Sequence, residues 1–101
     1  MIRASDQASF LEELRKHAGH IISKLPPEAL DKLVSTAVFD EGFVASFYYS
    51  DLGDVLTFNE FKGLLDLFGC CQEHGCQWDS FWTGGNCSPM PGNICCFPNR
   101  P

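Results

Sequence analysis

The chain has 101 residues, which is enough for one domain or for one small domain with an appendage. Hydrophobic residues make up 45% of the sequence, so the chain can build a packed core and is too apolar for a disordered protein. The net charge of -6 argues against a nucleic acid as the partner, because nucleic-acid binding calls for clustered Lys and Arg side chains.

The sequence contains no obvious membrane or export segment. No apolar run approaches the roughly 18 residues that are needed to span a bilayer, so we expect no transmembrane segment. No long apolar stretch follows Arg3 near the N-terminus, so we recognise no secretory signal. We therefore expect synthesis in the cytoplasm and leave the final localisation open. Export of the Cys-rich part described below would need another route.

The first predicted helix begins at Ser9, where Ser9 and Glu12 form a capping-box pattern. Apolar residues then recur at helical spacing, at Phe10, Leu14, Ala18, Ile21 and Leu25. The pair Pro26-Pro27 ends this helix, and Pro27 can occupy the first turn of a second helix. The apolar stripe of the second helix is Leu30, Leu33, Val34, Ala37 and Val38.

A later helix is predicted from Thr57 to Phe68. Thr57 and Glu60 form a second capping box, an apolar face of Phe61, Leu64, Leu65 and Phe68 follows, and Gly69 ends the helix. The stretch 43–52 allows two interpretations, an apolar helix face or a β-hairpin with a Gly-bearing turn. We favour a helix here, because both neighbouring segments look helical.

The composition changes after Gly69. The last 32 residues hold all six cysteines together with four Gly and four Pro, and the apolar periodicity disappears. Such a segment cannot order itself through apolar burial alone. We therefore predict a mainly α protein with two parts: a small bundle of three or four short helices over residues 1–69, and an irregular, disulfide-stabilised Cys-rich module over residues 70–101.

The cysteines of this module are Cys70, Cys71, Cys76, Cys87, Cys95 and Cys96. Their even number, tight clustering and Gly/Pro/Asn-rich loops favour a disulfide scaffold, although the sequence leaves the pairing open. Neighbouring cysteines rarely bond to each other. Two alternatives remain. One is a zinc site at Cys70, Cys71, His74 and Cys76, and the other is enzymatic modification of the thiols into thioethers or heterocycles.

Aromatic residues between the cysteines form the predicted binding surface. Trp78, Phe81 and Trp82 would be held rigid by the bridges and would contact a target. The sequence has no phosphate-binding loop, no nucleophile elbow and no paired carboxylates in a convincing acid/base context. We therefore predict no catalytic residues and a protein that is not an enzyme, with no cofactor unless the zinc alternative holds.

The two-part layout resembles precursors of ribosomally synthesised, post-translationally modified peptides, which join a helical leader to a short Cys-rich core. The segments 10–14 (FLEEL), 42–43 (GF) and 57–61 (TFNEF) are similar to leaders of the nitrogen-fixation type. The resemblance implies that processing or export machinery binds the helical part. The CC-C-C-CC order of the cysteines is also similar to a framework of animal venom peptides.

The leading hypothesis is a non-enzymatic precursor or carrier whose Cys-rich C-terminal peptide is the active binding module, with an antimicrobial or toxin-like role. The first alternative is a cytoplasmic metal-binding or redox-sensing protein that uses the Cys/His cluster. The second alternative is a secreted, disulfide-stabilised interaction protein in which both parts pack together.

Overall fold

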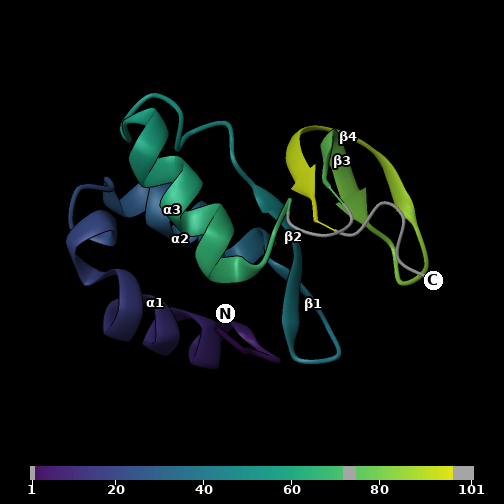
Figure 1. Ribbon diagram of the computed structural model, residues 1–101, viewed down its shortest axis with the longest axis horizontal. Coiled ribbons are helices and arrows are strands. Elements are labelled where there is room, and N and C mark those ends of the chain that lie inside the picture. Colours follow the sequence, from purple (N-terminus) through teal and green to yellow (C-terminus); the bar gives the residue numbers. More distant parts are fainter. Residues whose placement is uncertain (1, 72–74, 97–101) are drawn as a thin grey trace.

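The computed structural model describes residues 2–71 and 75–96, and in this part of the chain three helices accompany a four-stranded antiparallel sheet. The helices are α1 (Gln7–Ile22), α2 (Pro27–Thr36) and α3 (Phe58–Phe68), and the strands are β1 (Val38–Asp40), β2 (Phe43–Tyr48), β3 (Gln77–Trp82) and β4 (Cys87–Cys95). The strand order in the sheet is β1-β2-β4-β3. In Figure 1 the helices gather at one end of the molecule, the β3–β4 hairpin lies at the other, and the β1–β2 hairpin lies between them.

The prediction of a mainly α protein is therefore wrong, and the segment after α2 is one reason. A two-residue turn, Glu41-Gly42, joins Asp40 to its partner Phe43 across the β1–β2 hairpin. Both turn residues have positive φ, 53° and 85°, which is the backbone conformation of the tight turns that match the twist of two paired strands. The Phe43–Tyr48 segment consequently forms β2, and the helix that we favoured for this stretch does not exist.

The Cys-rich tail is the other reason that the prediction of a mainly α protein is wrong. Residues of the predicted irregular module form β3 and β4, and β4 pairs with β2 on one side and with β3 on the other. Half of the sheet thus comes from residues after Gly69. The division into domains 1–69 and 70–101 stays a prediction, and a single sheet contains strands from both sides of that boundary.

Some helix ends follow the sequence and others do not. Helix α1 ends at Ile22, before the predicted Leu25, and α2 ends at Thr36, so that Val38 of the predicted stripe begins β1 instead. Pro27 begins α2, Thr57 caps α3 with Glu60 in a capping box, and Gly69 ends α3 in the left-handed conformation, all as predicted. Helix α1 begins earlier than predicted, because Asp6 is its N-cap and Ser9 is the third residue of its first turn. Asp6 accepts a hydrogen bond from the Ser9 N–H at 2.8 Å.

The main core lies between the helices and one face of the sheet. Phe68 of α3 makes edge-to-face contacts with Phe10 of α1 and Phe47 of β2, each with ring centroids 5.3 Å apart. Ile94 and Cys96, which come from the Cys-rich tail, belong to the same cluster and are 0% and 1% exposed. The helical part and the tail therefore share one core.

A second, smaller cluster of buried residues comes from strands β2, β3 and β4. It consists of Ala45, Trp82 and Cys95, with Val38 and Cys87 packed against it. Beside it, the buried Ser46 hydroxyl accepts a hydrogen bond from the Trp82 N–H at 3.0 Å, which joins β2 to the end of β3. None of the helices within residues 2–71 and 75–96 has the length and apolar character that crossing a bilayer requires.

Candidate functional site

The six cysteines form three disulfides. Cys70 pairs with Cys96, Cys71 with Cys76, and Cys87 with Cys95. The prediction of a disulfide-stabilised protein is thus confirmed at this level. The helix end positions the first pair, because the left-handed Gly69 turns the chain and lets the Cys70 N–H donate to the Leu65 carbonyl at 2.8 Å.

The bridges remove the thiolates that the zinc alternative requires. Cys70, Cys71 and Cys76 are all bonded to other cysteines, and His74 lies outside the described residues. Within residues 2–71 and 75–96, no group of three or more His, Cys, Asp or Glu side chains is arranged to hold a metal ion. The described part of the chain therefore gives the zinc site no support.

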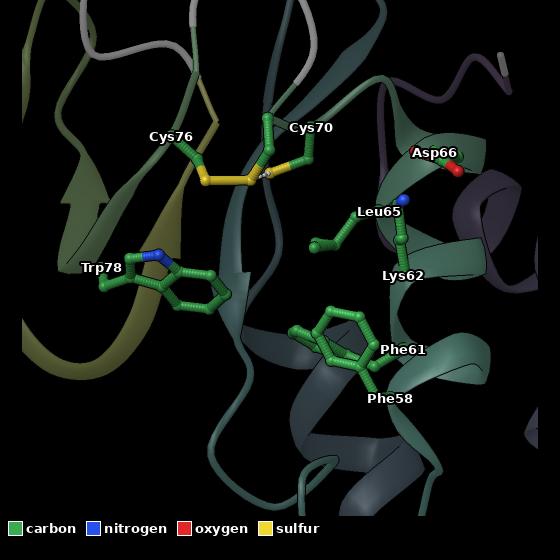
Figure 2. Close-up of a pocket in the computed structure, with 9 residues that line it drawn as sticks. Phe58, Phe61, Lys62, Leu65, Asp66, Cys70, Cys76 and Trp78 are labelled. Carbon is green, nitrogen blue, oxygen red and sulfur yellow. Dashed lines mark hydrogen bonds between the residues drawn. A yellow bond between two sulfur atoms is a disulfide. The ribbon is translucent and has the colours of Figure 1, made fainter.

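A groove lies between α3 and the start of β3, and we call it the α3–β3 groove (Figure 2). Its volume of about 510 Å³ lies within the range of small-ligand pockets. The apolar lining comes from one stripe of α3, from three cysteines and from one indole: Phe58, Phe61, Leu65, Cys70, Cys71, Cys76 and Trp78. Figure 2 shows the stripe of α3 facing Trp78 across the opening, with a disulfide above both.

Two of these aromatic side chains are unusually open to solvent. Phe58 is 78% exposed and Trp78 is 47% exposed. Large aromatic rings in such positions are enriched where proteins bind one another. Lys62 and Asp66 of α3 also line the groove, so one charge of each sign accompanies the apolar surface.

Trp78 packs against two aromatic rings. Its centroid lies 4.9 Å from the Tyr49 ring in an edge-to-face contact and 6.1 Å from the Phe61 ring. Tyr49 in turn contacts Phe61 at 6.3 Å. These contacts hold the indole in position and leave Trp78 47% exposed.

Asp79, next to Trp78, stabilises an irregular point in the β3–β4 pair. The register shifts between Trp78 and Ser80, and Asp79 has a positive φ of 55°. Its carboxylate accepts hydrogen bonds from the Gly92 N–H at 3.0 Å and from the Tyr49 hydroxyl at 3.3 Å. Burial, followed by the nearby Asp79 charge, raises the pKa of Tyr49 above its usual value. Asp79 thereby links the backbone that carries Trp78 to β4 and to the Tyr49 ring that contacts the indole.

The predicted aromatic surface is divided by the fold. Trp78 lines the groove, whereas Trp82 is only 6% exposed and belongs to the second apolar cluster. Phe81 is partly buried on β3 opposite Ser88. Trp82 therefore contributes little area to any contact surface.

Sequence reasoning missed Phe58, which lies before the predicted apolar face of α3 and is exposed. The spacing contains a signal, because Phe58 lies at a helical interval before Phe61 and Leu65 and extends their stripe to the surface. Leu65 is 7% exposed in the main core, and Phe61 packs against that core. An apolar face wider than the core needs indicates a second contact.

Comparisons with known proteins give little further guidance. No family model matches the chain, and no solved structure matches it. One curated relative, cytochrome P450 4p1 of Drosophila melanogaster, is 40% identical to this chain over 76 residues. The match covers 72% of this chain but only 14% of that protein, so the relative's activity cannot be assigned to this chain.

Proposed function

We propose that this protein is a secreted, non-enzymatic interaction protein that works as one disulfide-stabilised unit. Its α3–β3 groove binds an apolar segment of a partner protein. The observation that carries the proposal is the open aromatic groove, in which Phe58 and Trp78 are exposed beside a disulfide. Three disulfides suit an oxidising, extracellular compartment.

The shared sheet supports action as one unit. Strand β4 of the tail pairs with β2, and Ile94 and Cys96 are buried with Val44 and Phe47. The groove itself also needs both parts, because α3 lies before residue 70 and Trp78 lies after it. Releasing the tail would separate the two walls of the groove.

Peptides selected from a random phage-displayed library on the intact, oxidised protein are a direct probe of the groove. We expect the selected peptides to carry aromatic or aliphatic residues. Trp78→Ser should weaken their binding at least about tenfold, because exposed aromatic residues commonly supply most of the binding free energy. Isothermal titration calorimetry measures the change.

Met90→Ser is the matched control, because Met90 is 42% exposed and does not line the groove. Its affinity for the same peptides should stay that of the unmodified protein. Equal binding by the Trp78→Ser and unmodified proteins, with both still folded, would contradict the proposal.

A second candidate is the peptide precursor, and the positions of the bridges favour it. All three disulfides lie within residues 70–96. A cut before Cys70 would therefore leave a C-terminal peptide with every bridge intact, free to act as an antimicrobial or toxin-like module. Residues 1–69 would then serve the processing or export machinery.

Mass spectrometry of material from the native source separates the two candidates. A mature fragment that begins near residue 70 and retains three disulfides supports the precursor. An oxidised 101-residue chain as the only product supports the single interaction protein.

A further inference from the structure

We propose that the Cys71–Cys76 disulfide is a thiol–disulfide exchange site, which a small thiol such as reduced glutathione opens while the other two bridges stay closed. Both of its cysteines are partly exposed and line the open α3–β3 groove. Exchange begins with the attack of a thiolate on a sulfur atom, so access to the sulfur controls the rate. The groove provides that access.

The other two bridges are less accessible. Cys70 also lines the groove, but it is 0% exposed, and its partner Cys96 is 1% exposed; both belong to the main core. Cys95 is 0% exposed in the second cluster, and only its partner Cys87 reaches the surface in part. A thiolate in solution can therefore approach neither sulfur of the first bridge and only one sulfur of the second.

Local backbone structure adds to the difference from the Cys87–Cys95 bridge. The sulfur that leaves must move away from the one that is attacked, which is easier where the backbone is not held in a ladder. Cys71 and Cys76 lie outside the helices and strands, whereas Cys87 and Cys95 both lie in β4. The Cys71–Cys76 bridge also spans only 5 positions of sequence, against 26 for Cys70–Cys96, so it restricts the unfolded chain least.

The exchange is a balanced two-electron reduction. A glutathione thiolate attacks one sulfur of the pair, forms a mixed disulfide with it and expels the other cysteine as a thiolate. A second glutathione thiolate attacks the glutathione sulfur of that mixed disulfide, which yields oxidised glutathione and the second cysteine thiolate. Both protein thiolates then take up protons from water to an extent set by their pKa values and the pH.

We expect the reduction by glutathione to stop at the Cys71–Cys76 bridge. The Cys71 sulfur lies 3.9 Å from the Cys70 sulfur, so a Cys71 thiolate is placed to attack the buried bridge and expel Cys96. That step would join two neighbouring cysteines in a strained small ring. The strain keeps Cys70 bonded to Cys96.

Timed alkylation of the intact, oxidised chain tests the proposal. Samples treated with reduced glutathione are quenched in acid, alkylated with N-ethylmaleimide and mapped by mass spectrometry. The first thiols to appear should be those of Cys71 and Cys76, at least about tenfold faster than any other, because exposed disulfides are the labile ones. Early labelling of any other cysteine, including Cys96, or simultaneous labelling of all six would overturn the proposal.

Labelling of the unmodified chain should have a fast phase, at Cys71 and Cys76, and a slow phase at the other cysteines. A double variant, Cys71→Ser with Cys76→Ser, should lose the fast phase and keep the slow one. Its matched control, Cys87→Ser with Cys95→Ser, also lacks one bridge and should keep the fast phase. A fast phase that persists in the first variant would overturn the proposal. Should the control fail to fold, the labelling order in the unmodified chain decides. No groove ligand enters these measurements, so their outcome is independent of the proposed function.

Discussion

At the scale of single residues, two kinds of contact stabilise the start of α3. One joins neighbouring residues, and the other joins residues that are far apart in the sequence. The Thr57 side chain accepts a hydrogen bond from the Glu60 N–H, and Glu60 reaches back to the Thr57 N–H at 2.9 Å. This reciprocal pattern is readable from sequence, because it depends on residues three positions apart. The ion pair between Glu60 and Lys24 is not, since 36 positions separate the two residues and only the fold brings them together.

We expect that contact to make stability depend on acid. The hydrogen bond from Lys24, followed by that from the Thr57 N–H, lowers the pKa of Glu60 from 4.5 to about 2. Because the folded-state pKa is lower than the unfolded one, the stabilisation is fully present above pH 4.5 and is lost as the pH falls towards 2. Glu60→Gln should therefore lower the urea midpoint at neutral pH, and the gap to the unmodified protein should shrink across this range.

Glu12→Gln is the control for this measurement, because it removes an exposed carboxylate from α1 without touching the α3 cap. Its urea midpoint should follow that of the unmodified protein at each pH. A Glu60→Gln gap that stays constant from neutral pH to pH 2.5 would mean that folding does not lower the pKa of Glu60.

At the scale of elements, helices were predictable where their signals are local. Pro27, Thr57 and Gly69 mark helix ends through backbone chemistry that does not depend on the rest of the molecule. Strand β2 was not predictable in this way. Its apolar residues also fit a helix face, and pairing with β1 and β4 decides between the two conformations.

Strand β4 was even harder to predict from the sequence. Ser80 pairs with Pro89 and Trp78 pairs with Ile94, so residues 90–93 of β4 form a bulge opposite a much shorter segment of β3. Two prolines and a glycine in this strand are typical of a loop. The Asp79 carboxylate, which accepts a hydrogen bond from the Gly92 N–H within the bulge, lies 13 positions away and gives no local signal.

Gly92→Ala should disrupt this bulge. Gly92 has φ of +89°, and an added Cβ would lie 2.5 Å from Tyr48 Cε1. We expect a loss of about 1–2 kcal/mol from the left-handed backbone and roughly 1–3 kcal/mol more from the overlap with the Tyr48 ring. Urea denaturation measures the total.

Gly84→Ala separates these two costs. Gly84 has a similar φ of +91°, but nothing lies within 4 Å of the position that its Cβ would occupy. This variant should therefore show only the backbone cost. If the two variants lose equal stability, Tyr48 does not pack against Gly92 as the structure has it.

At the scale of the whole molecule, the cysteine content alone indicated disulfides, whereas the groove could not be predicted. Its walls are α3 and the start of β3, and the tail that carries β3 has no periodicity from which to place it. Trp78, which we chose as a contact residue, lines the groove, and its part in binding stays a prediction. The choice of Trp82 relied on composition, and burial in the second cluster could not be foreseen without the sheet.

The shared sheet leads to a prediction about the helical part alone. A chain of residues 1–69 keeps all three helices and β2 but loses β4, the central partner of β2. Val44 and Phe47 would also lose Ile94 and Cys96 from their core. Small domains have little stability to spare, so we expect residues 1–69 to lack a cooperative unfolding transition.

Urea denaturation followed by circular dichroism, together with amide hydrogen exchange, measures this expectation against the intact oxidised chain. The intact chain should unfold in one transition and protect the amides of β2, because β2 is paired on both sides. The 1–69 chain should retain partial helix and exchange the β2 amides quickly. A cooperative transition in the 1–69 chain, with slow exchange in β2, would mean that the helical part folds without the tail. That result would favour the precursor over the single interaction protein.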